Sequence, residues 1–153
     1  MKLKIRRANI LDKNFLEYGV IKLLSELRGC PVYLEQMNLN DTVTDMILDD
    51  KNYGIFIAEK DETQVGFIAF AVVKALHCGV YVMIEELWVS EKERNVGVGK
   101  LLMETLEQYC MEHGIRRIDV GLPGREFPDF NKTNGFYSGC GFIDVSIRKK
   151  KVL

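Results

Sequence analysis

The chain has 153 residues, of which 47% are apolar and 28% are charged, and its formal net charge is -1. This length suits one domain with a substantial core, and the composition lacks the charge excess and apolar poverty of a disordered chain. The nearly neutral balance gives no reason to expect a nucleic acid or an anionic membrane as partner. We therefore predict a single domain over residues 1–153.

The four cysteines lie far apart in the sequence, without Cys-x-x-Cys spacing; they are Cys30, Cys78, Cys110 and Cys140. We expect free thiols in a reducing compartment and no metal site. The N-terminus lacks the apolar stretch of a signal peptide, and no apolar run approaches the roughly 18 residues of a membrane span. The sequence predicts a cytoplasmic protein.

The N-terminal part alternates between strand and helix patterns. Residues 2–8 predict a strand, and Asp12 can cap a helix that Gly29 and Pro31 would end. The apolar face of this helix would consist of Leu16, Val20, Leu23, Leu24 and Leu27. A shorter helix would follow, with Asn40 or Asp41 as its cap.

The middle of the chain predicts an antiparallel meander. Three runs have strand character, with a tight polar turn between the first two, and they span residues 53–60, 64–77 and 79–89. The pattern then becomes helical from Gly97 to His113, and Gly114 stands at the expected stop. The last predicted elements are a strand at 116–121, a loop at 122–130, a helix at 131–139 and a strand from Phe142.

A glycine-containing turn, Arg94 to Lys100, joins the third strand of the meander to the next helix. A helix start offers four unpaired N–H groups and a partial positive charge, and glycines let an anion come close to them. The turn does not fit the nucleoside-triphosphate loop, because Arg94 and Leu101 replace its first glycine and its hydroxyl residue. Leu102 replaces the third glycine of the dinucleotide fingerprint.

The remaining pattern, Arg-x-x-Gly-x-Gly, resembles the pyrophosphate motif of the GNAT superfamily of N-acetyltransferases, which bind acetyl-CoA. A second segment, Asn131 to Phe142, is similar to the family's Asn-containing helix, Phe-Tyr pair and Gly-Phe strand entry. Asn131 stands one position later than the family's asparagine. The two motifs occur in the family's order and with similar spacing, and the order of predicted elements resembles the GNAT fold across nearly the whole chain.

The resemblance implies an α/β (α+β) fold with the order β-α-α-β-β-β-α-β-α-β. Its mixed, mostly antiparallel sheet would have about six to seven strands and about four flanking helices. We expect parallel pairing between the strands before and after the Gly97 helix, since a connection through a helix favours it.

The resemblance also implies a coenzyme site at the end of the fourth strand and in the turn after it. Its residues would be Leu87, Trp88, Val89, Arg94, Asn95, Val96, Gly97, Val98, Gly99, Lys100 and Asn131. Backbone N–H groups near Leu87 and Val89 would polarise the thioester carbonyl and hold the pantetheine arm. We expect the Trp88 side chain itself in the core.

Acetyl transfer to an amine needs a base, because an alkylammonium with a pKa of roughly 10.4 is not nucleophilic. Glu85 and Glu86 are the candidates. Consecutive strand residues point to opposite faces, but a β-bulge would turn both into one cleft, where burial raises a carboxyl pKa. The sequence favours Glu86 only slightly, and it leaves open that one glutamate faces solvent while the other pairs with a cation.

Tyr137 resembles the tyrosine that protonates the coenzyme thiolate in many family members; the alternative is an aromatic residue that only fills the core. The predicted function is direct acetyl transfer from acetyl-CoA to a primary amine in a ternary complex, without an acetylated cysteine. Acidic residues near the cleft favour a cationic acceptor, such as an amino sugar, a polyamine or a lysine-like amine, either small or on a protein.

Two other functions stay open from the sequence. One is a non-catalytic acyl-CoA-binding module, and the other is a partner-binding domain whose glycine turn is only a helix start. The loops at 29–36 and 125–129 would border the acceptor site. A homodimer is common among relatives.

Overall fold

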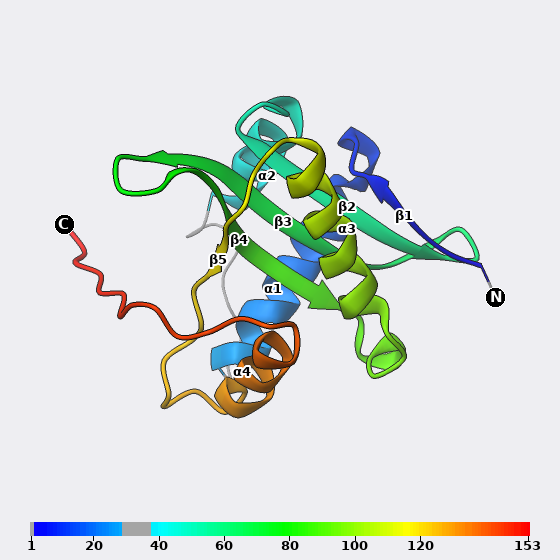
Figure 1. The fold of residues 1–153 in the computed structure, drawn as a ribbon. Coiled ribbons are helices and arrows are strands. Elements are labelled where there is room, and N and C mark those ends of the chain that lie inside the picture. Colours follow the sequence, from blue (N-terminus) through cyan, green and yellow to red (C-terminus); the bar gives the residue numbers. More distant parts are fainter. Residues whose placement is uncertain (1, 29–37) are drawn as a thin grey trace.

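The fold is a mixed sheet between helices, seen in a computed structural model that describes residues 2–28 and 38–153 (Figure 1). Within these residues the sheet has five strands in the order β1-β2-β3-β4-β5. They are β1 (Leu3–Arg7), β2 (Tyr53–Lys60), β3 (Thr63–Ala75), β4 (Gly79–Val89) and β5 (Ile118–Val120). The α-helices are α1 (Lys13–Arg28), α2 (Leu39–Leu48), α3 (Val98–Glu112) and α4 (Phe130–Gly139). The first four strands pair antiparallel and β5 runs parallel to β4, which confirms the predicted mixed sheet.

The sheet buries both of its faces, because successive side chains of a strand point to opposite sides. In β3, Phe67 packs under α1 and α2, whereas Ile68 packs under α3. The cluster below α1 and α2 consists of Leu16, Val20, Leu39, Val43, Ile55, Ile57, Phe67, Ala69 and Trp88. The larger cluster on the α3 side includes Leu102, Met103, Leu106 and Tyr137. Trp88 therefore lies in the core, as the sequence predicts.

The C-terminal segment differs from the prediction. Residues 142–153 have no regular structure, so the strand expected from Phe142 is wrong and the sheet has fewer strands than the expected six to seven. The segment alternates like a strand, yet Ile143, Val145 and Ile147 are exposed. A strand forms only where neighbouring backbone groups pair with it, and alternation alone does not supply that neighbour.

The starts of the first two helices also differ from the prediction. Asp12 is not the cap: Asn9 caps a short 3-10 helix at Ile10–Asp12 that leads into α1, and its side chain accepts from the Leu11 N–H. The second helix begins at Leu39, after Asn38 in the left-handed conformation, rather than at Asn40 or Asp41. The predicted helix stops, Gly29 and Pro31, lie outside the described residues.

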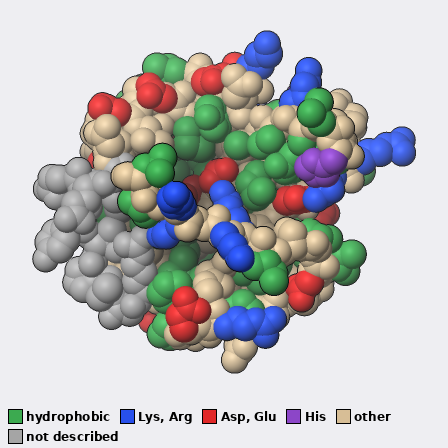
Figure 2. Space-filling view, turned by 90° about the vertical axis from the view of Figure 1, so that its left-hand side faces the viewer, with side chains coloured by type: hydrophobic (Ala, Val, Ile, Leu, Met, Phe, Trp, Pro, Cys, Tyr) green, Lys and Arg blue, Asp and Glu red, His purple; other side chains and the backbone are tan. Residues whose placement is uncertain are grey.

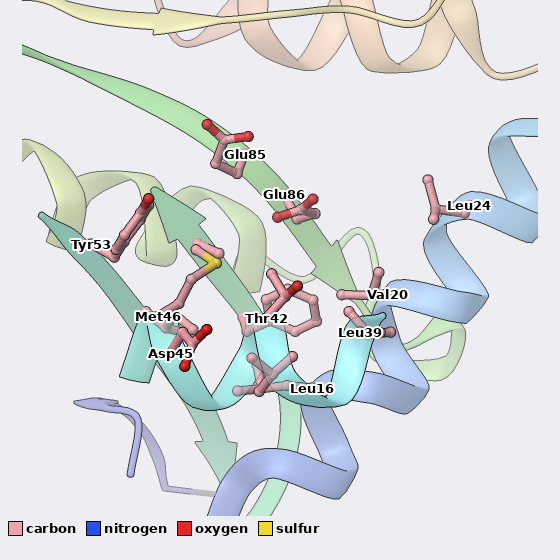
Figure 3. Close-up of a pocket in the computed structure, with 14 residues that line it drawn as sticks. Leu16, Val20, Leu24, Leu39, Thr42, Asp45, Met46, Tyr53, Glu85 and Glu86 are labelled. Atoms are coloured by element: carbon pink, nitrogen blue, oxygen red, sulfur yellow. The ribbon is translucent and has the colours of Figure 1, made fainter. Parts of the chain in front are cut away.

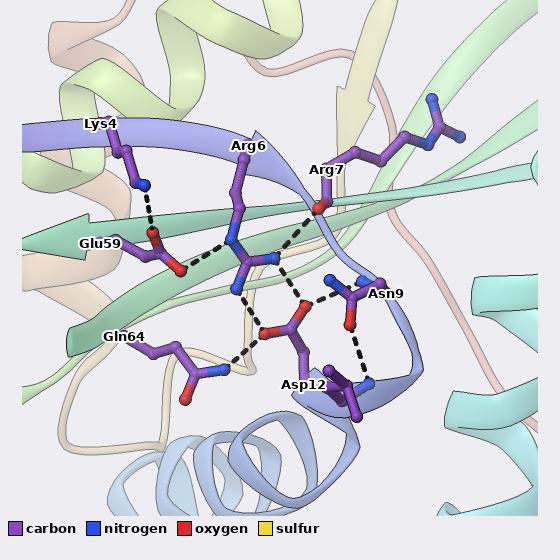
Figure 4. Close-up of polar contacts among 8 residues, drawn as sticks. Lys4, Arg6, Arg7, Asn9, Asp12, Glu59 and Gln64 are labelled. Carbon is purple, nitrogen blue, oxygen red and sulfur yellow. Dashed lines mark hydrogen bonds and ion pairs between the residues drawn. The ribbon is translucent and has the colours of Figure 1, made fainter. Parts of the chain in front are cut away.

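Asp12 instead lies at the centre of a buried ionic network (Figure 4). Its carboxylate accepts hydrogen bonds from two Arg6 nitrogens, at 2.8 and 2.7 Å, and from the Asn9 N–H and the Gln64 amide. Arg6 also donates to Glu59 over 2.7 Å. Because these residues belong to β1, β2, β3 and the start of α1, the network holds the first helix against the sheet edge.

Candidate active site

A β-bulge in β4 places two carboxylates on one face of the sheet. Ala69 of β3 pairs with Glu86 and Phe70 pairs with Ile84, so Glu85 is the extra residue. An extra residue shifts the alternation of side chains by one position. Ile84 before the bulge packs on the α3 side, and Trp88 after it packs on the α1 side. Of the two arrangements that the sequence left open, a regular strand and a bulge, the bulge is present, and both glutamates face α1 and α2.

Glu85 and Glu86 line a cavity of about 500 Å³, which we call the α1–α2 cavity (Figure 3). The described residues that line it are Leu16, Val20, Leu24, Leu39, Thr42, Val43, Asp45, Met46, Tyr53, Ile55, Phe67, Ala69, Glu85 and Glu86. On one side of the molecule, Figure 2 shows a hollowed region with acidic side chains among hydrophobic ones and with Lys and Arg side chains beside them. The cavity is thus mostly apolar with an acidic wall on β4.

The far end of β4 has an open edge beside the bulge. β5 pairs with β4 only at Val82, Met83 and Ile84, so β4 continues to Val89 with β3 as its one described neighbour. The strands therefore part immediately after Ile84. This separation exposes backbone groups that a regular sheet would pair.

The backbone donors at this edge can be identified from their neighbours. The Ser90 N–H donates to the Val65 carbonyl of β3 over 2.8 Å. Backbone groups point alternately to the two sides of a strand, so the Leu87 and Val89 N–H groups point to the open edge. The Val89 carbonyl points the same way, since it accepts from Arg94 Nε over 2.8 Å. These N–H groups suit an extended ligand that binds as an added strand.

A second cavity of about 430 Å³, the β4–α3 cleft, lies along this open edge. Its described lining is Leu23, Glu26, Leu27, Leu87, Trp88, Val89, Arg94, Asn95, Gly97, Gly99, Lys100, Asp129, Lys132, Thr133, Phe136 and Tyr137. Eight of the predicted coenzyme residues lie here. Three do not: Val96 is exposed, Val98 is buried in the core, and Asn131 is exposed on α4.

The glycine turn forms the wall of the cleft at the start of α3. Gly97 precedes the helix with a φ of 93°, and Asn95 has a φ of 63°. No side chain caps the helix, so its first N–H groups are left for a ligand or for water. A helix N-terminus of this kind, with Lys100 beside it, is a site for a phosphate group. The donor set therefore fits a coenzyme that carries a diphosphate and an amide-rich arm.

Arg94 is engaged within the protein. In addition to its bond to Val89, it donates from one terminal nitrogen to both Glu26 oxygens, at 2.9 and 2.7 Å. Glu26 belongs to α1, so this pair joins the turn to the helix across the cleft. A guanidinium has five N–H donors, and it keeps others for a second partner. Sequence reasoning missed Glu26, which carries no motif.

Other lining residues of the cleft were also missed. Leu23 and Leu27 were assigned only to a core-facing helix stripe, although such a stripe extends past the core edge. Thr133 occupies the place of the family's small residue, four positions before Tyr137, and that match was its one signal. Asp129 belongs to the loop at 125–129 that the sequence places beside the acceptor, and the structure places it in the lining of the β4–α3 cleft. Lys132 left no signal, because its position depends on how α4 is placed.

Two titratable groups that line these cavities have shifted pKa values. Burial raises the pKa of Glu86 to about 7, and the neighbouring charge of Glu85 adds to the effect. Burial also raises the pKa of the Tyr137 phenol well above its usual range, with contributions from Cys140 and Glu86. At neutral pH, Glu86 can therefore exchange a proton while Tyr137 stays protonated.

The described part of the chain has no disulfide, no metal site and no membrane-spanning helix. Cys78, Cys110 and Cys140 are free thiols, while Cys30 lies outside that part. Across residues 2–28 and 38–153, no group of His, Cys, Asp or Glu side chains is arranged to hold a metal ion. None of the described helices is long and apolar enough to span a membrane.

Comparison with known proteins agrees with this geometry. The sequence profile of the Acetyltransferase (GNAT) family matches residues 20–142. A possible acetyltransferase from Clostridium difficile 630 is 16% identical, with a TM-score of 0.83 over 100% of this chain and 99% of its own. A predicted acetyltransferase with acetyl-CoA from Clostridium acetobutylicum is 16% identical, with a TM-score of 0.79 over 99% and 96%.

Glucosamine-6-phosphate N-acetyltransferase from Arabidopsis thaliana has the same fold, with 21% identity and a TM-score of 0.72 over 99% of each chain. No curated protein sequence matches the chain. The family profile covers most of the chain, and the parted strands and the glycine turn agree with it. The chain belongs to the GNAT family of acetyltransferases.

Proposed function

We propose that the protein is an N-acetyltransferase that moves an acetyl group from acetyl-CoA directly to a primary amine. The observation that carries the proposal is the bulge at Glu85, which turns two carboxylates into one cavity beside the open edge of β4. A structural carboxylate pair would instead have cationic partners. Neither glutamate side chain has a hydrogen bond or ion pair with another described residue.

The coenzyme would lie in the β4–α3 cleft. Lys100 and the first N–H groups of α3 would hold its diphosphate, and the Leu87 and Val89 N–H groups would bind its arm and polarise the thioester carbonyl. Acetyl-CoA would supply the activated acetyl group. The apolar side chains of Leu23, Leu27 and Phe136 would exclude water from the cleft.

The acceptor would enter the α1–α2 cavity with its amine beside Glu86. Glu86, with a pKa of about 7, would accept the proton of the ammonium, so that the free amine attacks the carbonyl carbon. Tyr137 would donate its hydroxyl proton to the thiolate as the carbon–sulfur bond breaks. Transfer is direct, so no cysteine carries the acetyl group.

Two measurements test this function. Acetyl-CoA with a panel of amines should release free thiol, and mass spectrometry should find the matching amide. Tyr137→Phe should lower kcat by at least tenfold with little change in the coenzyme Kd, because only one hydroxyl is lost. A turnover equal to that of the wild type assigns the proton to another group. Coenzyme binding without turnover of any amine would favour the non-catalytic acyl-CoA-binding module.

The solved relatives make an amine acceptor reasonable, since one is named as a glucosamine-6-phosphate N-acetyltransferase. A cytoplasmic location stays a prediction. A homodimer also stays a prediction; the exposed apolar side chains of Ile143, Val145 and Ile147 favour association with a second copy. Light scattering after size-exclusion chromatography tests it, and a monomeric mass would contradict it.

A further inference from the structure

The side chains that line the α1–α2 cavity restrict the class of amine that it can accept. Its walls are mainly hydrocarbon, supplied by side chains such as Leu16, Val20, Val43 and Met46. Every charged side chain in its described lining is acidic. These are Glu85 and Glu86 on β4 and Asp45 on α2.

The three carboxylates lie on two walls. Figure 3 shows Glu85 and Glu86 on β4, with Asp45 across the cavity on α2 next to Met46. Asp45 is exposed at the rim, and its carboxylate, like those of the two glutamates, has no hydrogen bond or ion pair with another described residue. Carboxylates without a cationic partner among the described residues therefore stand on two sides of the apolar cavity.

This arrangement discriminates between the amine classes that the sequence left open. An amino sugar brings several hydroxyl groups, which need hydrogen-bond partners when they are buried. Apart from the carboxylates, the described lining offers the hydroxyls of Thr42 and Tyr53. An alkyl chain needs no partners, and it gains from contact with the hydrocarbon walls.

Resting on the proposed function, we infer that the acceptor is a linear diamine, an alkyl chain with an ammonium group at each end. One ammonium lies beside Glu86 and loses its proton before transfer. The chain crosses the apolar floor, and the second ammonium stays charged beside Asp45. Acetylation of the first nitrogen forms the amide, and the coenzyme leaves as the free thiol.

The test compares kcat/KM for α,ω-diaminoalkanes of increasing length, n-alkylamines of the same lengths and glucosamine, with saturating acetyl-CoA. We expect the best diamine to exceed its matched monoamine by about sixfold, of which about twofold comes from its two equivalent nitrogens and about threefold from the exposed ion pair. The advantage should peak at one chain length and shrink in high salt. Glucosamine should be the poorest substrate.

Asp45→Asn should bring the ratio of diamine to monoamine kcat/KM close to about two, the statistical value for two equivalent nitrogens. Asp41→Asn is the matched control, since Asp41 is exposed on the same helix but does not line the cavity, and it should leave the ratio unchanged. Preference for glucosamine or for the monoamines, or a ratio that Asp45→Asn does not alter, overturns the diamine assignment alone. Acetylation of no amine overturns the proposed function together with this inference.

Discussion

Glu86 lines the α1–α2 cavity and Tyr137 lines the β4–α3 cleft, yet the charge of Glu86 contributes to the raised pKa of Tyr137. Tyr137 packs with the α3 cluster, while Glu86 faces α1 and α2. The open edge of β4 lies between them, since Leu87 follows Glu86 directly and lines the cleft with Tyr137. The proposed base and acid therefore flank the place where the acetyl group would pass.

Glu86 should control the acidic limb of the pH–rate profile. Its pKa of about 7 makes kcat/KM rise with pH and level off above that value, because only the ionised form accepts a proton. Glu86→Gln should lower kcat/KM at neutral pH by about a hundredfold and remove the limb. Glu85→Gln should move the limb to lower pH, since it removes one of the two causes of the raised pKa.

Stability gives a second check on the same residue. The folded state holds a proton on Glu86 up to about pH 7, while the unfolded chain loses it near 4.5, so stability falls as the pH rises between these values. Glu86→Gln should abolish this part of the decline in melting temperature. A decline of wild-type size in the variant would mean that Glu86 is already ionised in the folded protein.

The Arg94–Glu26 pair should oppose coenzyme binding. The Glu26 carboxylate occupies the guanidinium and places a negative charge in the cleft that would receive a diphosphate. Glu26→Gln should lower the Kd of CoA about threefold, in line with a partly exposed ion pair, whereas Arg94→Ala should raise it. Isothermal titration measures both effects. Pantetheine, which lacks the diphosphate, is the control and should bind the two variants alike.

The opposite result is also informative for this pair. If Glu26→Gln weakens CoA binding as much as Arg94→Ala does, then Glu26 positions Arg94 for the ligand rather than competing with it. Glu62→Gln, in the exposed turn before β3, controls for the loss of one negative charge.

Variants of the two glycines in the turn should separate two effects: the backbone conformation that Gly97 requires, and the close approach of the coenzyme to the backbone at Gly99. Gly97 has a φ of 93°, so Gly97→Val should cost about 1–2 kcal/mol of stability. Gly99 has an ordinary φ, and an added Cβ would lie 3.4 Å from the Phe136 ring, which is an ordinary contact, so Gly99→Ala should fold nearly as well as the wild type. Both should weaken CoA binding about tenfold, a loss of roughly 1.4 kcal/mol. Unchanged affinity in both variants would remove the diphosphate from this turn.

The sequence predicted those elements whose periodicity reports local packing. The meander, the α3 helix and the parallel pairing of β5 with β4 appear as expected, because alternation and helical stripes follow directly from burial. The segment from Phe142 alternates equally well and forms no strand, since pairing depends on a neighbour that no local pattern encodes. Asp12 was mistaken for a cap because its buried partner, Arg6, is contributed by another element.

Prediction of the site had the same limit. The bulge at Glu85 was inferred from two consecutive carboxylates that needed one cleft, and the register confirms it. The Arg94–Glu26 pair and the placement of Asp45 opposite Glu86 join residues from different elements, so only the fold reveals them. The one-residue offset of Asn131 was visible in the sequence, and this residue is exposed, outside the lining of the cleft.

The Asp12 network should control acid stability. Burial alone would raise the pKa of Asp12, but hydrogen bonds from Arg6, Asn9 and Gln64 outweigh it and hold this pKa below the usual value of 3.8. The ionised Asp12 carboxylate therefore stabilises the folded state above about pH 4, and this stabilisation is lost as the pH falls through the lowered pKa of Asp12 in the folded protein. Asp12→Asn should cost about 3 kcal/mol at neutral pH, because it leaves Arg6 without its main partner. Urea unfolding should then show the variant and the wild type converging at acidic pH.

The matched control for this prediction is Asp50→Asn. Asp50 is exposed, and its side chain has no hydrogen bond or ion pair with another described residue, so its loss should change stability by less than about 0.5 kcal/mol. A gap between wild type and Asp12→Asn that stays constant down to pH 2 would contradict the ionic origin of the effect. The lost stability would then not come from the shape of the side chain, because an amide has nearly the shape of a carboxyl group. Its remaining source would be the turn that is closed by the hydrogen bond from the Asn9 N–H to the Asp12 carboxylate.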